Sequence, residues 1–210
     1  MSERRIQRQH GHQESAPGHR IEDPEGPLFQ SAASAAAFAL NFSGQNYQKP
    51  LTSRMAQPAS ARGRGLSGLD GAAQAGMIRA ELAAIGLTGE AIIIAEMTNK
   101  TKPCTCKAPC CSGELTNWEW AAAIGLLSNI AKDMKICPGY ANVRANLLKR
   151  FFGVPLEITE IARLCGVTRD TVYNHNAKLF SVFKPLKKKA WSDFDARLVE
   201  SSLISNQKVP

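Results

Sequence analysis

The chain has 210 residues, with 26 Lys and Arg against 18 Asp and Glu and a formal net charge of +8. This length is enough for one or two small domains, and the excess of cations favours an anionic partner, with nucleic acid as the first candidate. No stretch approaches the roughly 18 consecutive apolar residues of a membrane helix, and the N-terminus lacks the apolar core of a signal peptide. We therefore expect a cytoplasmic protein with no membrane partner.

The N-terminal part of the chain shows little sign of a packed core. Residues 1–27 combine mixed charges with several Pro and Gly and are predicted to be a disordered tail. The alanine-rich run that follows favours a short helix, with Phe38 and Leu40 among its apolar anchors. Pro and Gly then return in a loose segment. Residues 28–65 are thus predicted to be a short helix and a linker.

A helical region is predicted from 66 to 139. Its first helix covers 71–85, and apolar spacing places Met77 on the inner side together with three other residues. A second, shorter helix is expected over 88–97. Three consecutive isoleucines there are also compatible with a strand, but the neighbouring helical patterns favour a helix.

A third helix is predicted to begin at Thr116 and to run to about Lys135. Glu119 follows Thr116 by three residues, which is the spacing of a capping box. Trp120 falls on the apolar face of this helix and is expected in the core. Trp118 is interpreted either as a lid over that face or as an exposed contact.

Four cysteines crowd the loop 103–113, PCTCKAPCCSG. The candidate metal ligands are Cys104, Cys106, Cys110 and Cys111. Four thiolates can hold a tetrahedral zinc ion. The close spacing makes it awkward for one chain to direct all four inward, so three of them with Cys137 as an outside ligand is a second arrangement. Free or redox-sensitive thiols are the alternative to a zinc site.

The stretch from Leu156 to Leu179 has the pattern of two helices joined by a tight turn. Apolar residues recur at spacings of three and four up to Cys165, and Gly166 then occupies a place where a helix ends in the left-handed conformation. Thr168 is the expected N-cap of the second helix. With a preceding helix over 140–152, this is the spacing of a DNA-binding helix-turn-helix. An ordinary helical hairpin is the alternative.

The second helix carries side chains that can read a DNA duplex. Arginine can bind guanine O6 and N7, and asparagine can pair with the adenine edge, whereas Thr168, Lys178 and the later lysine run suit phosphates. The candidate DNA-binding residues are Thr168, Arg169, Asp170, Tyr173, Asn174, Lys178, Lys187, Lys188 and Lys189.

Two further expectations concern the residues around this helix. His175 takes a position that is usually apolar, so it is interpreted as a hydrogen-bonded histidine of the inner face. Pro185 is expected to kink or stop the helix, and a last helix is predicted from Ser192 to about Leu203.

The segment GVTRDTVYNHNAKLF, preceded by ITEIARLC, resembles the helix-turn-helix of bacterial sigma factor region 4 and the domain of many phage and prophage regulators. Sigma region 4 implies contact with a promoter element and with RNA polymerase, although no counterpart of the other sigma regions is found. The order of cysteine cluster, helix-turn-helix and basic tail is also similar to the late-gene antitermination proteins of lambdoid phages. Those proteins bind DNA and then load onto RNA polymerase, but they carry regular CxxC pairs that are absent here.

The expected fold is all-α, with a helical N-terminal region that holds the cysteine-rich loop and a C-terminal three-helix helix-turn-helix domain over 140–206. The expected function is that of a sequence-specific DNA-binding transcription regulator of phage or prophage type, with its recognition helix at about 168–180 and RNA polymerase as a second partner. The alternative is a DNA-packaging component resembling a terminase small subunit, which would act as a homo-oligomer. No phosphate-binding glycine loop, carboxylate pair or Ser/His/Asp arrangement is found, so no enzymatic activity is expected.

Overall fold

The computed structural model describes residues 28–42, 68–104, 106 and 112–204. The predicted tail and the predicted linker lie outside this range. The described elements are, in chain order, α1 (Ala32–Asn41), α3 (Gly68–Ala84), α4 (Leu87–Met97), β1 (Thr101–Pro103), β2 (Glu114–Thr116), α5 (Trp118–Asp133), α6 (Ala141–Phe151), α7 (Ile158–Cys165) and α8 (Arg169–Glu200). The structure is therefore mostly helical, as predicted, with one short antiparallel hairpin that the sequence did not indicate. None of the described helices is both long and apolar enough to cross a membrane.

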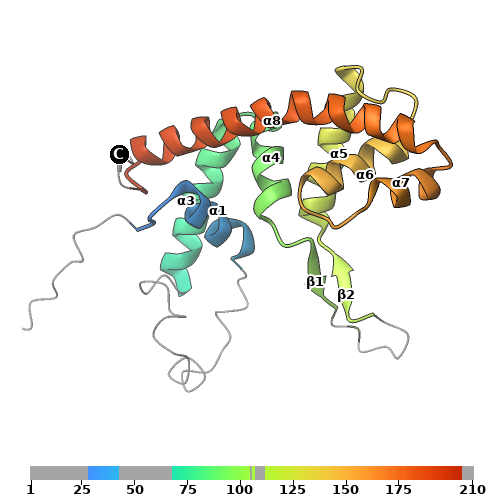
Figure 1. Ribbon diagram of the computed structural model, residues 1–210. Coiled ribbons are helices and arrows are strands. Elements are labelled where there is room, and N and C mark those ends of the chain that lie inside the picture. Colours follow the sequence, from blue (N-terminus) through green and yellow to red (C-terminus); the bar gives the residue numbers. More distant parts are fainter. Residues whose placement is uncertain (1–27, 43–67, 105, 107–111, 205–210) are drawn as a thin grey trace, which may run out of the picture.

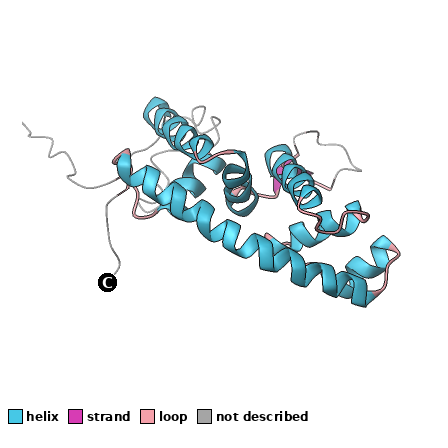
Figure 2. Cartoon of the chain, turned by 90° about the horizontal axis from the view of Figure 1, so that it is seen from above, coloured by secondary structure: helices cyan, strands magenta, loops and turns pink. Residues whose placement is uncertain are grey.

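The longest element, α8, organises the packing of the others. Its 32 residues run along the length of the molecule, and the other helices lie along it (Figures 1 and 2). The first half of α8 contacts α6 and α7, and the second half contacts α3 and α4. Its buried positions are Val172, Leu179, Phe183, Ala190, Phe194 and Leu198. These repeat at helical spacing, so a single apolar stripe holds both halves of the structure.

The sequence predicts that the helix either kinks or ends at Pro185, and the second alternative is wrong, because α8 continues through this residue. The separate helix predicted from Ser192 is likewise part of α8. Proline removes one backbone hydrogen bond, which here would have reached the carbonyl of Ser181. Pro185 and Ser181 are both exposed, so water can reach the freed carbonyl. On the opposite side Phe183 is fully buried, and this packing holds the helix together across the proline.

We expect Pro185→Ala to raise the free energy of unfolding, by up to about 3 kcal/mol, because alanine restores the missing hydrogen bond inside a helix. The exposed position means that no core contact is lost. Urea denaturation of the two proteins measures the difference. A variant that is less stable than the wild type would show that the proline ring is part of the packing.

The orientation of α3 differs from the prediction at one residue. Met77 is 48% exposed, whereas the buried positions of α3 include Ala75, Ile78 and Leu82. Two of the three charged residues of α3 explain this rotation, because Arg79 and Glu81 reach neighbouring helices. Arg79 pairs with Glu119 of α5 at 2.5 Å, and Glu81 pairs with Arg197 of α8 at 2.7 Å. A polar contact between helices thus competes with the simple apolar pattern.

The start of α5 also differs from the prediction. Thr116 belongs to β2, and the N-cap is Asn117, whose side-chain oxygen accepts from the Glu119 backbone N–H at 3.2 Å. The expected capping box therefore does not form, since the Glu119 carboxylate is engaged by Arg79. Trp120 lies in the core as predicted, and its indole N–H donates to the Ala95 carbonyl of α4 at 3.2 Å.

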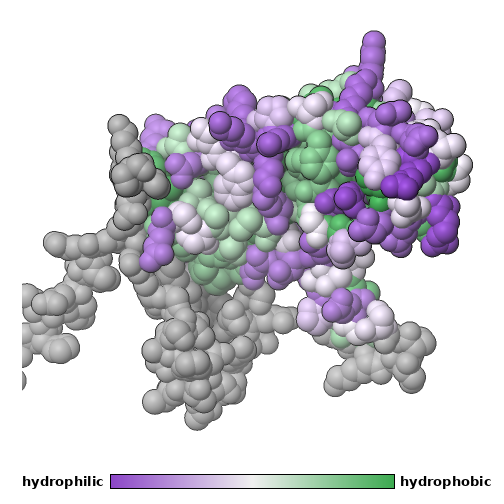
Figure 3. All heavy atoms as spheres, viewed as in Figure 1, coloured by the Kyte–Doolittle hydropathy of each residue, from purple (hydrophilic) through white to green (hydrophobic). Residues whose placement is uncertain are grey.

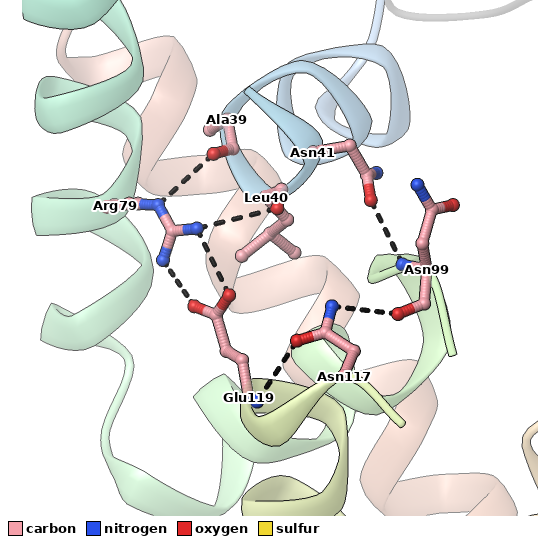
Figure 4. Close-up of polar contacts among 7 residues, drawn as sticks. All are labelled: Ala39, Leu40, Asn41, Arg79, Asn99, Asn117 and Glu119. Carbon is pink, nitrogen blue, oxygen red and sulfur yellow. Dashed lines mark hydrogen bonds and ion pairs between the residues drawn. The ribbon is translucent and has the colours of Figure 1, made fainter. Parts of the chain in front are cut away.

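Three asparagines and a lysine fix the base of the hairpin. Asn117 donates to the Asn99 carbonyl at 2.8 Å, and the Asn99 N–H donates to the side chain of Asn41 at 3.0 Å (Figure 4). Lys100 donates to the carbonyl of Gly153, which follows α6, at 3.0 Å. The hairpin is consequently held to α1, to α5 and to the segment that leads into α7.

Candidate nucleic-acid interface

The segment from α7 to α8 has the local structure that the sequence predicts. Gly166 follows α7 with φ 65° and ψ 33°, the left-handed conformation that glycine adopts at low cost. The Val167 N–H donates back to the Ala162 carbonyl at 3.1 Å and closes the turn. Thr168 is the N-cap of α8, and its side-chain oxygen accepts from the Thr171 N–H at 3.3 Å. The two helices are therefore joined by a short and well-defined turn.

Replacing Gly166 by alanine should lower the free energy of unfolding by about 1 to 2 kcal/mol, because the left-handed conformation costs an L-residue that much. A Cβ at this position would meet no other atom within 4 Å, so the expected loss is conformational rather than steric. Gly125, in the middle of α5, is the matched control. A Cβ there would also meet nothing, and alanine should stabilise by about 0.5 to 1 kcal/mol. Equal effects in thermal unfolding would contradict the assigned turn.

The loop between α5 and α6 supports the start of α8. Arg144 of α6 is buried and donates to the Cys137 carbonyl at 2.6 Å, which fixes the loop from inside. The ammonium of Lys178 donates to the Lys135 carbonyl at 3.1 Å. Each of α6, α7 and α8 also contacts the other two. The first turns of α8 are therefore held on two sides, by α7 and by this loop.

His175 faces the same loop. It is half-buried, and its ring lies 5.7 Å from that of Tyr140, centroid to centroid. Among the described residues its side chain has no hydrogen-bond partner, so the predicted inner-face placement is correct and the predicted hydrogen bond is not seen.

Four of the candidate DNA-binding residues lie together on the exposed surface of the first two turns of α8: Arg169, Asp170, Tyr173 and Asn174. The guanidinium of Arg169 donates to the Tyr173 hydroxyl at 3.2 Å and lies over its ring, 5.2 Å from the centroid. This hydrogen bond raises the pKa of Arg169. An arginine side chain is a cation at physiological pH in any case. The contact holds the arginine on the outer surface, where its remaining N–H groups are free to meet a ligand.

The other candidates are partly engaged within the protein. The Thr168 hydroxyl caps α8, and the Lys178 ammonium binds a carbonyl. Lys187 forms an ion pair with Glu96 of α4 at 2.5 Å, and Lys189 pairs with Asp193 one turn along α8. Lys188 is exposed and has no ion pair within the described part of the chain.

Lys184 is an exposed cation that the candidate set omitted. It precedes Lys188 by four residues, so both side chains lie on one side of α8. The spacing of the two lysines indicates that they share one side of α8, but not that both lack an ion-pair partner among the described residues. The long-range contact between Lys187 and Glu96 had no signal in the local sequence. Hydrophilic side chains prevail over the end of the molecule that α7 and the start of α8 form (Figure 3).

The cysteine cluster is only partly within the described residues. Cys110 and Cys111 lie outside them, whereas Cys104 and Cys106 follow β1, and the Cys104 N–H donates to the Gly113 carbonyl at 2.8 Å. No group of three or more potential metal ligands occurs among the described residues. The four-cysteine zinc site accordingly stays a prediction.

Cys137 does not fit the second arrangement of ligands. It follows the C-terminus of α5, while the hairpin precedes the N-terminus of that helix and points away from it (Figure 1). At about 1.5 Å per residue, the 16 residues of α5 separate the two by roughly 24 Å. Burial raises the pKa of the Cys137 thiol to about 11, against the opposing attraction of Arg144 and Lys178. This cysteine is a buried, protonated side chain of the core.

Comparison of the chain with models of protein families, with curated proteins and with solved structures gave no match.

Proposed function

We propose that this chain is a sequence-specific DNA-binding protein that regulates transcription, with the first turns of α8 as its reading element. The observation that carries the proposal is the exposed group of Arg169, Asp170, Tyr173 and Asn174 on a capped helix that follows a left-handed glycine. A helix of this kind fits the major groove of B-DNA with its N-terminal residues against the bases. The net charge of +8 supports an anionic partner.

Each residue of this group has a base edge that suits it. The guanidinium of Arg169 can donate two hydrogen bonds to guanine O6 and N7, and its contact with Tyr173 reduces the freedom that binding would remove. The amide of Asn174 can pair with adenine N6 and N7. Asp170 can accept a hydrogen bond from the amino group of cytosine. In the free protein its negative charge stabilises the N-terminus of α8.

The phosphate contacts on this proposal come from Lys184 and Lys188. They lie further along α8, at about 15 and 21 Å from Asn174 at the rise of a helix, where a helix leaving the major groove passes the DNA backbone. Both are exposed, and neither forms an ion pair with another described residue. Lys187 and Lys189 are less suited, because a phosphate would have to displace a carboxylate from each.

We expect Lys184→Ala with Lys188→Ala to weaken binding to all sequences and to reduce the slope of log K against log salt by nearly one unit per lost phosphate contact. Lys187→Ala with Lys189→Ala is the matched control, since it removes the same charge. Its slope should change less, because those ammonium groups already have carboxylate partners. A larger change of this slope in the control would show that Lys187 and Lys189 contact phosphates, as the sequence predicts for the lysine run.

Selection of bound sequences from a random duplex pool, near physiological salt, tests the proposed function. A single enriched motif is the expected result. Salt-sensitive binding without an enriched motif would instead favour the DNA-packaging alternative, in which a homo-oligomer hands DNA to an enzyme. No binding at all would show that α7 and α8 form an ordinary structural helical hairpin. Transcription with RNA polymerase on a template that carries the motif would then test the proposed effect on polymerase.

A further inference from the structure

A shallow apolar groove lies between α4 and α5, away from the residues proposed to meet DNA. Its walls are lined by Leu87, Glu90, Ala91 and Ile94 of α4 and by Trp118, Glu119, Ala122, Ala123 and Leu126 of α5. The two helices pack side by side, and the hairpin connects the end of α4 to the start of α5 (Figure 1). This groove has no role in the proposed contact with DNA.

The groove exposes large apolar side chains to an unusual degree. Leu87 is 71% exposed and Trp118 is 73% exposed, more than any other large hydrophobic residue in the described part of the chain. Leu126, also at the groove, is 36% exposed. Single exposed apolar residues are ordinary, but several around one concave surface indicate a binding site. Tryptophan at such a site commonly dominates the binding energy.

The spacing of the wall residues fits a helical ligand. Positions 87, 91 and 94 of α4 and positions 118, 122 and 126 of α5 repeat every three or four residues, so each helix offers one continuous wall. At the rise of a helix, the wall from 87 to 94 is about 10 Å long, roughly two helical turns. An amphipathic helix with anchors at i, i+3 or i+4, and i+7 has the same dimension.

The charges at the groove select among partners. Glu90 is half-buried at the groove and has no ion-pair partner among the described residues. The carboxylate of Glu119 is already paired with Arg79 at 2.5 Å, and no lysine or arginine belongs to the lining. A free carboxylate repels a phosphate backbone, so nucleic acid does not suit this surface. It also disfavours a dimer packed groove to groove, because both Glu90 carboxylates would enter one interface whose lining has no lysine or arginine to pair with them.

We propose that the α4–α5 groove docks an amphipathic helix of another protein, whose apolar anchors cover Leu87 and Trp118 and whose lysine or arginine pairs with Glu90. Apolar burial supplies the affinity, and the cation beside Glu90 supplies the orientation. The chain would then hold DNA through α8 and a protein partner through α4 and α5. This inference stands apart from the proposed contact with DNA, since none of the groove residues belongs to α7 or α8.

The test uses the full chain and two synthetic helical peptides about four turns long, which share leucine anchors at i, i+4 and i+7 and differ in flanking residues. One peptide carries lysines beside the anchors and the other carries glutamates. Titration of labelled peptide, followed by fluorescence anisotropy, should show saturable binding of the lysine peptide and weaker binding of the glutamate peptide. Glu90→Lys should reverse this order. No saturable binding of either peptide would overturn the proposal.

Leu87→Ala should weaken binding of the lysine peptide about tenfold or more, as expected when an apolar anchor is removed. Leu87 lies outside the core, so this variant is expected to fold, and circular dichroism checks that it does. Met77→Ala is the control, because Met77 is an exposed apolar residue of α3 that does not line the groove. An equal effect of both substitutions would contradict a specific groove.

Two further readouts separate this inference from its alternatives. Sedimentation of the free protein with and without Leu87→Ala detects self-association through the groove, which would assign it to a second copy and overturn the proposal. Arg169→Ala should leave peptide binding unchanged, and Leu87→Ala should leave DNA binding unchanged. The proposals for peptide binding and for DNA binding can thus be contradicted independently of each other.

Discussion

Phe183→Ala is expected to lower the free energy of unfolding by about 3 to 5 kcal/mol, the usual cost of removing a buried phenylalanine from a core. Phe183 is fully buried in the middle of α8, and its ring lies 6.0 Å from that of Phe151 in α6, centroid to centroid. The substitution would open a cavity where α8 passes from the α6–α7 end to the α3–α4 end. Urea denaturation followed by circular dichroism measures the loss.

Phe180→Ala is the matched control for this substitution. Phe180 lies on the same helix and also contacts Phe151, with ring centroids 4.9 Å apart, but it is 39% exposed. Since much of the Phe180 surface already meets water, we expect Phe180→Ala to lower the free energy of unfolding clearly less than Phe183→Ala does. A loss at Phe183 no greater than at Phe180 would show that the buried stripe of α8 does not hold the two ends together.

The second large effect is expected on DNA recognition. Arg169→Ala and Asn174→Ala should each reduce the discrimination between the selected DNA site and a site with one changed base pair by about 1 to 3 kcal/mol. The effect should appear at a different base pair for each residue, because the two side chains lie one turn or more apart on α8. Competition titrations with single-base variants of the selected site measure both.

Ser192→Ala provides the control for recognition. Ser192 is exposed near the C-terminal end of α8, beyond the proposed phosphate contacts, so its loss should change neither affinity nor discrimination. If Arg169→Ala and Asn174→Ala behave like Ser192→Ala, the first turns of α8 do not read the bases.

Local features of the fold were predictable from the sequence because their causes are local. Alanine content and apolar spacing indicate the helices, and the left-handed glycine and threonine cap between α7 and α8 follow from residues within one turn of each other. The ion pair between Lys189 and Asp193 also has a local cause, since the two residues lie four positions apart on one helix.

Features that depend on distant residues were not predictable. Met77 is exposed because Arg79 and Glu81 reach α5 and α8, which are far away in the sequence. Pro185 lies within a helix because packing on the opposite side of α8 compensates for the lost hydrogen bond. The hairpin was missed because its three-residue strands have no apolar alternation, and all six of their residues are exposed.

The candidate site likewise combines features that the local sequence predicts with features that depend on distant residues. The residue types on the first turns of α8 follow from the motif, whereas the availability of each lysine does not. Lys187 is engaged by Glu96, a residue of α4 that no local pattern connects to it. The exposed pair Lys184 and Lys188 could be chosen over the lysine run only after these partners were known.

The proposed contact between Arg169 and a guanine in the major groove is tested most directly by methylation interference on the selected duplex. Methylation at guanine N7 blocks the major-groove edge that an arginine binds, whereas methylation at adenine N3 blocks the minor groove. We predict interference at a guanine N7 with the wild type, and its loss at that same guanine with Arg169→Ala. Interference confined to adenine N3, or a guanine signal that Arg169→Ala leaves unchanged, would contradict the proposed placement of α8.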